Sequence, residues 1–491
     1  MKKYILSIDA GTTSSRAILF DKKGNQISIS QFEFNQFFPK ESWVEHDPTE
    51  IWETQLKAIK NVINESKINV DEIDSIGITN QRETTVIWNK NTGQPVYNAI
   101  VWQDRRTAFI CDELKAKGFE KSFYDKTGLV LDAYFSGTKI KWILDSDPQV
   151  RELANNGDLL FGTIDTWLIW NLTGGKCHMT DYSNASRTLM FNIHTLKWDK
   201  ELLSILNIPN TLLPDVVDSS KKIGFSEKSI LGSEIQICGV AGDQQAALFG
   251  QMCINPGDVK NTYGTGCFCM MNTGKKAVKS NNKMLTTIAW KIGKETTYAL
   301  EGSVFIAGAL VQWLRDQLNI IKDSSEIETL ASSVKDSGGV TFISALSGLG
   351  APYWNPTATG AIMGITRGTQ KGHIARAALE AIALRSLEII TEMEKDSGTK
   401  FNKLKVDGGA SNNNLLMQIQ SNFLKTTVVR PRTTETTALG AAFLAGLGSG
   451  FWSSIEEIKD LWKIDKVFNP SDNRNDQLVL NNWKKRIKKI Q

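Results

Sequence analysis

The stretch from Ile5 to Phe20 carries side chains that suit phosphate chemistry. An alternating apolar run enters a polar turn and another apolar run leaves it, which predicts two paired strands. Gly11 lets backbone N–H groups approach an anion closely, and Arg16 adds positive charge. The hydroxyl donors of the turn are Thr12, Thr13, Ser14 and Ser15. The stretch predicts a phosphate-holding hairpin, although an ordinary hairpin with a polar turn has the same pattern.

Asp9 stands at the end of the first of these strands. A carboxylate there can reach a Mg²⁺ ion directly or through water, because Mg²⁺ prefers carboxylate, water and phosphate oxygens. Asp9 is therefore the candidate metal ligand. Four isolated histidines and six scattered cysteines predict neither a further metal site nor a disulfide framework.

A second hairpin of the same plan lies in the other half of the chain. Residues 258–271 read as a strand, a turn of Gly264, Thr265 and Gly266, and a return strand. Two such segments, one near the start of each half, favour a duplicated fold whose halves face each other. The alternative is a coincidence between two ordinary glycine-containing turns.

Two further segments supply charged groups that suit acid–base work. Residues 236–240 form an apolar strand that leads into a small-residue helix from Ala246, so Asp243 is expected at a strand-to-helix corner. Arg82 and Glu83 lie in a polar loop between hairpin-like strands at 73–78 and 85–88. Adjacent residues of a regular strand point to opposite faces, so both can meet one small ligand only if the chain bends there. The alternative for this pair is an exposed ion pair.

Other segments of the second half predict structure more than chemistry. Residues 373–394 have the apolar stripe of a core helix, and residues 404–406 form a strand before the Gly408–Gly409 loop, with a helix over 415–424. Residues 436–447 are rich in Ala and Gly, whose small side chains permit close packing of a helix against a sheet. Residues 218–233 are expected to form a polar loop.

The whole chain predicts two large α/β domains. Its 491 residues exceed the size at which single cores stop growing, and we place the boundary so that the domains are 1–252 and 253–491. The 57 basic and 53 acidic residues give a small net charge of +4, which argues against nucleic-acid binding. The basic residues at 484–489 suit the solvated end of an amphipathic helix. No apolar run predicts a leader or a membrane-inserted segment, so a cytoplasmic protein is expected.

Taken together, these segments resemble the actin, hexokinase and heat-shock ATPase superfamily, and within it the FGGY carbohydrate kinases. The chain has neither a GxxxxGK[ST] nor a GxGxxG motif, so the hairpins must supply the phosphate site. The most specific segments are residues 80–85 (NQRETT), 242–248 (GDQQAAL), 261–268 (NTYGTGCF), 42–48 (SWVEHDP) and 134–139 (YFSGTK). The resemblance implies two duplicated ribonuclease H-like domains with a catalytic cleft between them.

The resemblance is to the family members that phosphorylate glycerol with Mg-ATP, the first step of glycerol catabolism. It implies that Asp243 takes the proton of the attacking hydroxyl and that Asp9 serves Mg²⁺. The implied glycerol ligands are Arg82, Glu83, Tyr134, Asp243 and Gln244, with Trp102 and Phe268 over the carbon backbone. The implied ATP ligands are Thr12, Thr13, Ser14, Arg16, Thr265, Gly308, Gln312, Gly409 and Asn413.

Two departures and two alternatives accompany the resemblance. Ala10 stands where many relatives have Gln, and residues 218–233 lack the segment linked to inhibition by fructose 1,6-bisphosphate in some members. Ser229 stands where certain others carry a phosphorylated histidine, so regulation by either route is not expected. The alternatives are a kinase for another polyol or ketose, such as xylulose or erythritol, and an actin-like filament protein. Relatives commonly form homodimers or homotetramers.

Overall fold

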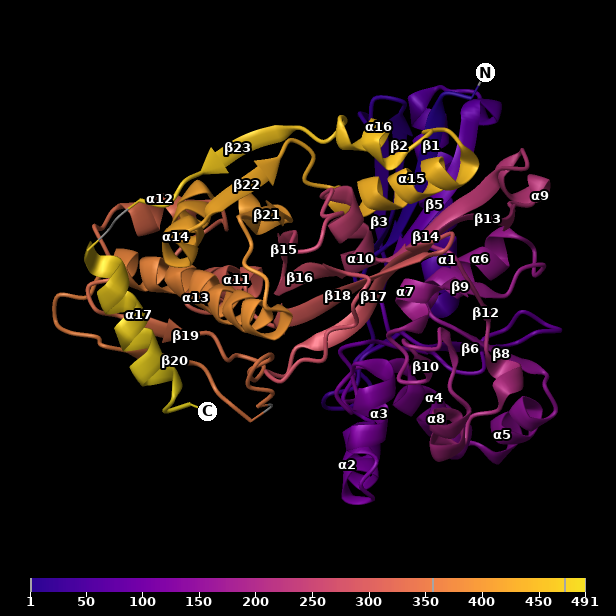
Figure 1. Cartoon of the computed structure of the whole chain (residues 1–491), viewed down its shortest axis with the longest axis horizontal. Coiled ribbons are helices and arrows are strands. Elements are labelled where there is room, and N and C mark those ends of the chain that lie inside the picture. The colour runs from indigo at the N-terminus through magenta and orange to yellow at the C-terminus, as the bar shows by residue number, and fades with distance from the viewer. Residues whose placement is uncertain (1, 356, 472–473, 491) are drawn as a thin grey trace.

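Two mixed β-sheets form the centres of two lobes in the computed structural model, which describes residues 2–355, 357–471 and 474–490 (Figure 1). The first sheet has six strands in the order β13-β14-β5-β1-β2-β3. The bounds of these strands are β1 (Tyr4–Ala10), β2 (Ser14–Asp21), β3 (Gln26–Glu33), β5 (Ile73–Asn80), β13 (Ser220–Phe225) and β14 (Gln236–Gly242).

The second sheet has seven strands in the order β17-β18-β16-β15-β21-β22-β23. Their bounds are β15 (Val259–Tyr263), β16 (Cys267–Gly274), β17 (Leu285–Ile292), β18 (Glu295–Val304), β21 (Lys403–Asp407), β22 (Thr427–Pro431) and β23 (Ile464–Phe468).

The two sheets repeat one pattern of strand directions. In the first, β1 pairs antiparallel with β2 and parallel with β5, β5 is parallel to β14, and β13 closes the edge antiparallel. In the second, β15 takes the place of β1, with β16 antiparallel, β21 and β22 parallel, and β23 antiparallel at the edge. The predicted duplication is confirmed, and the two predicted hairpins occupy equivalent places, one in each sheet.

Helices cover both faces of the first sheet. Helix α1 (Pro48–Ser66) packs on β2 and β3, and it starts where the Asp47 side chain accepts a hydrogen bond from the Thr49 N–H. On the other face lies α15 (Thr436–Ser449), which comes from the far end of the chain (Figure 1).

The contacts of α15 are unusually close because glycines line them. A Cβ added at Gly77 of β5 would lie 2.2 Å from the Ala441 carbonyl oxygen. A Cβ at Gly440 would lie 1.8 Å from the Ala246 carbonyl oxygen of α10 (Asp243–Gly250). The prediction that the Ala/Gly-rich segment packs a helix tightly against a sheet is confirmed.

The second sheet is covered mainly by α13 (Lys371–Ser397), the expected core helix, with α12 (Glu326–Ser332) and α14 (Asn414–Leu424) packed against it. The other helices are α2 (Ala108–Ala116), α3 (Glu120–Thr127), α4 (Ser136–Ser146), α5 (Pro148–Asn155), α6 (Ile164–Leu172), α7 (Tyr182–Ala185), α8 (Lys200–Leu206), α9 (Lys228–Leu231), α11 (Gly308–Asp316), α16 (Ile455–Lys459) and α17 (Arg474–Ile487). The remaining strands, all short, are β4 (Glu45–His46), β6 (Val86–Asn89), β7 (Ala99–Ile100), β8 (Leu159–Gly162), β9 (Met179–Asp181), β10 (Phe191–Asn192), β11 (Lys197–Trp198), β12 (Asp215–Val217), β19 (Thr341–Ile343) and β20 (Ala361–Met363).

Three local expectations were wrong. The strands at 73–80 and 86–89 do not form a hairpin, because β5 joins the first sheet while β6 pairs with β8. Residues 218–233 are not simply a polar loop, since they contain β13 and α9. Helix α10 begins at Asp243 and not at Ala246, which places that carboxylate in the first turn.

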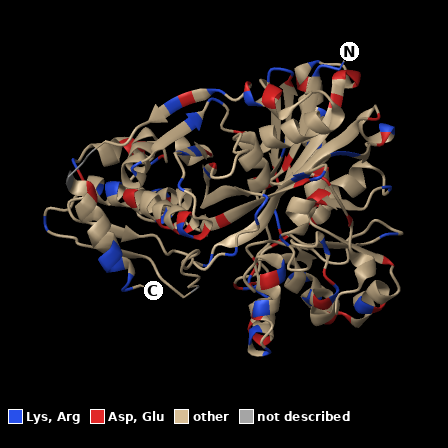
Figure 2. Cartoon of the chain, viewed as in Figure 1, with Lys and Arg blue, Asp and Glu red and all other residues tan. Residues whose placement is uncertain are grey.

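The charged residues of both signs are interspersed over the two lobes (Figure 2). The basic end of α17 belongs to an amphipathic helix, as expected, since Trp483 and Ile487 are buried against the second lobe. In the described part of the chain, no helix is both long and apolar enough to cross a bilayer.

Candidate active site

The loop after β5 bends sharply between two adjacent charged residues. Glu83 has a φ of 60°, in the left-handed region, and the Thr84 N–H donates to the Arg82 carbonyl oxygen at 2.7 Å. Arg82 and Glu83 are 2% and 1% exposed. The predicted bend is therefore present, and the alternative of an exposed ion pair is wrong.

Arg82 is the centre of a buried charge network. Its Nε lies 3.1 Å from Asp243 Oδ1, and its two terminal nitrogens donate to Glu301 at 2.5 and 3.0 Å. Its Nη2 also lies 3.5 Å from the Tyr134 hydroxyl. Burial by itself would lower the pKa of Arg82, but the carboxylates of Glu301 and Glu83 raise it well above the ordinary value.

Glu83 is held by a second arginine. Arg187 Nε donates to Glu83 Oε1 at 2.6 Å, and Arg187 Nη2 donates to Glu301 at 3.0 Å. Burial raises the pKa of Glu83 against the opposing effect of both arginines. For Glu301 the balance is reversed, because Arg187 and Arg82 outweigh burial and lower its pKa to about 2.

Sequence reasoning missed Arg187 and Glu301. Glu301 is a single charge in the apolar end of β18, and an isolated carboxylate in such a strand demands a buried cation. That signal was available in the sequence. Arg187 lies in the turn after α7, where nothing in its neighbours marks it.

Three aromatic rings lie beside this network. The Trp102 ring is 5.6 Å from the Tyr134 ring and 6.2 Å from the Phe268 ring, both edge-on. Burial raises the pKa of the Tyr134 hydroxyl, which keeps it protonated and able to donate. The indole N–H of Trp102 donates to the Thr12 hydroxyl at 3.0 Å. One side chain therefore touches the first hairpin and packs beside Phe268 of the second.

Asp243 and Gln244 form the first turn of α10. The Asp243 side chain is 31% exposed, and its Oδ1 accepts from the Gln244 N–H at 2.7 Å. A carboxylate in the first turn is favoured by the helix dipole. Gln244 Oε1 accepts at 2.5 Å from Lys260, a buried cation whose pKa is lowered by burial. The accessible carboxylate thus stands at the edge of an otherwise buried polar cluster.

The first hairpin turns tightly, with the Gly11 N–H donating to the Ser14 carbonyl at 2.9 Å. Thr13 is exposed and Thr12 is half-buried, whereas the Ser14 hydroxyl already accepts a bond from Gln31. Arg16 pairs with Glu435, just before α15, and its Nε is 3.9 Å from Asp9.

Asp9 is a buried carboxylate with few protein partners. Burial raises its pKa to about 6, partly opposed by Arg16, and no hydrogen bond from another described residue reaches its oxygens. No group of three or more possible metal-ligating side chains occurs among the described residues. A single under-bonded carboxylate fits Mg²⁺, which usually takes one or two protein carboxylates, waters and substrate phosphates.

The second hairpin is met by two glycine segments. The Gly308 N–H, at the start of α11, donates to the Gly264 carbonyl at 3.0 Å. Gly408 has a φ of 81°, and a Cβ there would lie 2.6 Å from the Tyr263 carbonyl. A Cβ at Gly409 would meet open space. The structure therefore brings together the second turn, the start of α11 and the loop after β21.

The other predicted nucleotide residues lie around this meeting point. Thr265 is at the exposed tip of the turn, and Gln312 is exposed one helical turn after Gly308. Asn413 caps α14, where its side chain accepts from the Leu416 N–H at 2.8 Å.

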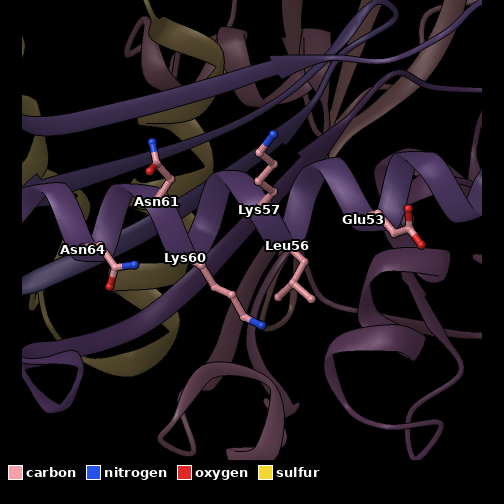
Figure 3. A pocket seen from close by; sticks show the side chains of 6 residues that line it. All are labelled: Glu53, Leu56, Lys57, Lys60, Asn61 and Asn64. Carbon is pink, nitrogen blue, oxygen red and sulfur yellow. The ribbon is translucent and has the colours of Figure 1, made fainter.

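A hollow elsewhere on the surface contains none of these residues. It measures about 370 Å³ and runs along the outer face of α1, where its lining side chains are Glu53, Leu56, Lys57, Lys60, Asn61 and Asn64 (Figure 3). Its open, solvated lining offers no convergent polar groups, so the buried network around Arg82 remains the candidate site.

Comparisons with known proteins agree with this arrangement. Residues 4–250 match the N-terminal domain, and residues 259–449 the C-terminal domain, of the FGGY family of carbohydrate kinases. A glycerol kinase of Thermoanaerobacter pseudethanolicus is 60% identical over 490 residues, covering 100% of this chain and 99% of that protein. Glycerol kinase 2 of Thermotoga maritima is 59% identical over 486 residues, covering 99% and 98%. The crystal structure of Plasmodium falciparum glycerol kinase with ADP superposes with a TM-score of 0.93 at 37% identity, covering 99% and 98%. The chain belongs to the FGGY family of carbohydrate kinases.

Proposed function

We propose that this chain transfers the γ-phosphoryl group of ATP to a terminal hydroxyl of glycerol, giving sn-glycerol 3-phosphate and ADP, the first step of glycerol catabolism. The observation that carries the proposal is the accessible Asp243 carboxylate, 3.1 Å from buried Arg82. Arg82 in turn lies 3.5 Å from the Tyr134 hydroxyl, and the Trp102 ring packs edge-on against the Tyr134 and Phe268 rings. The glycerol kinases of Thermoanaerobacter pseudethanolicus and Thermotoga maritima, to which the chain is similar, support it by name.

Asp243 is proposed as the general base. As the glycerol oxygen bonds to phosphorus and the bond from phosphorus to the ADP oxygen breaks, the carboxylate accepts the hydroxyl proton. A neutral alcohol is a poor nucleophile, so this transfer can contribute roughly 10²–10⁴-fold in rate. Most of the remaining acceleration is assigned to positioning and charge neutralisation.

The other residues proposed to bind glycerol are of two kinds, polar side chains for its hydroxyls and aromatic rings over its carbons. Arg82 and Tyr134 donate, Glu83 accepts, and Gln244 is held by Lys260 at its oxygen, so its NH₂ remains to donate. Trp102 and Phe268 cover the carbons. A ligand without the matching hydroxyls leaves buried polar groups unpaired, which costs much more than a lost contact.

For the nucleotide, we propose phosphate contacts from the first hairpin and adenosine contacts from the second lobe. The first set is Thr12, Thr13, Ser14 and Arg16; the second is Thr265, Gly308, Gln312, Gly409 and Asn413. Asp9 would hold Mg²⁺, which neutralises charge on the phosphate oxygens when bound. Closing the lobes over both substrates would exclude water and so discourage ATP hydrolysis.

The remaining sequence-based expectations stay predictions. They are the division into domains 1–252 and 253–491, the cytoplasmic location, and assembly as a homodimer or homotetramer.

A substrate panel with coupled ADP detection tests the function. Glycerol should be phosphorylated well ahead of xylulose and erythritol, and a clear preference for either of those would replace glycerol as the substrate. Filaments formed with ATP, without glycerol-dependent ADP release, would support the actin-like alternative instead.

The variant Asp243→Asn tests the assigned base. Turnover should be lost while ATP binding, measured by calorimetry, is retained. The matched control is Asp258→Asn, because Asp258 only supports the local turn by accepting from the Asn255 N–H. Near-normal turnover of Asp243→Asn would refute the role of the carboxylate.

A further inference from the structure

We propose that Glu301 is a positioning residue for the acceptor site, which fixes Arg82 directly and Glu83 through Arg187. This inference rests on the proposed function, because it assumes that Arg82 and Glu83 bind the polyol. Glu301 belongs to β18 of the second sheet, whereas Arg82 and Glu83 follow β5 of the first.

The first argument is the geometry of the Arg82–Glu301 pair. Nη1 and Nη2 of Arg82 donate to the two different oxygens of Glu301, at 2.5 and 3.0 Å. A two-point bond between a guanidinium and a carboxylate fixes the plane of both groups as well as their distance. It also leaves the Arg82 Nε edge facing Asp243.

The second argument is the link to Glu83. Glu301 Oε1 also accepts from Arg187 Nη2 at 3.0 Å, and Arg187 Nε donates to Glu83 Oε1 at 2.6 Å. The Glu301 carboxylate therefore positions both residues of the bend, Arg82 directly and Glu83 through Arg187. All the members are almost fully buried, with side-chain exposures of 2% or less, so water cannot replace a lost partner.

The third argument is charge balance. In this region the buried cations Arg82, Arg187 and Lys260 face the carboxylates of Glu83, Glu301, Asp243 and Asp407, and Asp407 is the carboxylate that acts most strongly on Lys260. If Glu301 is neutral, Arg82 keeps Asp243 as its nearest carboxylate, since Glu83 is 3.9 Å away. The guanidinium then has Asp243 as its closest anionic partner, while Gln245 Oε1 still accepts from Nη1 at 3.2 Å, so its charge acts more strongly on the proposed base.

Glu301 is itself held firmly relative to the first lobe. Its strand β18 pairs with β17, and β17 is bonded to first-half residues at Thr286, Ile288 and Lys291. The Thr286 N–H donates to the Gly128 carbonyl at 2.9 Å, and Lys291 pairs with Asp218 at 2.7 Å. The β17–β18 hairpin is therefore bonded to the first half of the chain and places Glu301 against Arg82.

The test is the variant Glu301→Gln, compared with Glu380→Gln. Glu380 is a matched control, because it is also a buried second-half glutamate paired with an arginine, Arg376, outside the acceptor site. Both variants and the wild type are assayed for the KM of glycerol, the KM of ATP, kcat and the thermal midpoint.

Glu301→Gln should raise the KM of glycerol by about tenfold or more and lower kcat, because charge-assisted bonds that orient the acceptor ligands are lost. The KM of ATP should stay within about twofold, since the proposed nucleotide contacts lie elsewhere. Glu380→Gln should match the wild type in all three constants. Glu301→Asp, which keeps the charge on a shorter stem, should recover part of the glycerol affinity.

The outcomes separate this inference from the proposed function. A wild-type protein that phosphorylates no polyol or sugar refutes the function and the inference together. A wild-type kinase whose Glu301→Gln variant keeps its glycerol KM and kcat refutes the positioning role alone. An equal rise in the KM of glycerol and the KM of ATP would also refute the positioning role, because a general loss of structure weakens the binding of both substrates. If Glu301→Gln does not fold, the glycerol KM, ATP KM and kcat of Glu301→Asp are compared with those of the wild type instead.

Discussion

Replacing Asp9 by Asn should make the substrate-free protein more stable at neutral pH while weakening its use of Mg²⁺. Burial raises the pKa of Asp9 from 3.8 to about 6, so the folded protein holds this carboxylate charged at a cost. A pKa raised from 3.8 to about 6 corresponds to roughly 3 kcal/mol at pH values above both pKa values. Asn has nearly the same shape and carries no charge, so it removes that cost.

The pH dependence gives the sign of the effect. Between about pH 4 and pH 6 the folded state binds more protons at Asp9 than the unfolded state, so its contribution to the free energy of unfolding falls as pH rises. The stability advantage of Asp9→Asn should therefore be small near pH 4, about half developed near pH 5, and roughly 3 kcal/mol at pH 8.

Thermal unfolding of both proteins at pH 5 and pH 8, without nucleotide and with EDTA, measures this difference. A coupled assay at varied Mg²⁺ should show that the variant needs roughly 10- to 100-fold more metal. Asp165→Asn is the control, because burial raises the pKa of Asp165 to about 7 but its partners are the Thr163 and Thr180 hydroxyls, away from the site. It should share the stability trend and leave the Mg²⁺ requirement unchanged. An Asp9→Asn protein that is less stable than the wild type at pH 8, or has an unchanged Mg²⁺ requirement, would refute the reasoning.

Three other expectations follow from one contact of Trp102, the close packing at Gly440 and the burial of His46. Trp102→Phe keeps an aromatic cover but loses the N–H bond to Thr12 at 3.0 Å, so kcat should fall by about three- to tenfold, and an unchanged kcat would contradict the link between pocket and hairpin. Gly440→Ala would place a Cβ 1.8 Å from the Ala246 carbonyl oxygen. The free energy of unfolding should fall by at least about 2 kcal/mol, which is measured as a lower thermal midpoint, and an unchanged midpoint would refute the close packing. Burial lowers the pKa of His46 to about 4, so its contribution to stability is present above about pH 6.5 and is lost as pH falls toward 4, by up to about 3 kcal/mol; His46→Gln should lessen the acid sensitivity of unfolding, and equal sensitivity would contradict this.

Local signals in the sequence were enough to predict much of the fold. The two hairpins follow from apolar runs around glycine turns, and the close packing of α15 follows from its Ala and Gly content. The bend at Glu83 followed from the family resemblance, which implies that two adjacent side chains meet one ligand. Each of these predictions depends on residues that are near each other in the chain.

The parts that escaped prediction depend on contacts between distant segments. Whether β6 pairs with β5 or β8 is decided by the packing of whole sheets, which a short strand does not reveal. Glu301 and Arg187 could each be seen as charges, but their pairing with Arg82 and Glu83 requires both lobes to be in place. The start of α10 at Asp243 is a smaller error, since an acidic residue suits a first helical turn.

The position of α15 has a consequence for how the protein is made. Residues 4–250 contain every strand of the first sheet, yet one face of that sheet is covered by residues 436–449. During synthesis, β5 and β14 therefore leave the ribosome long before the helix that buries their apolar face. Until residues 436–449 are synthesised, this apolar face of the first sheet stays exposed, where chaperones can bind it and other chains can aggregate with it. A chain that stops before Thr436 would leave it bare permanently.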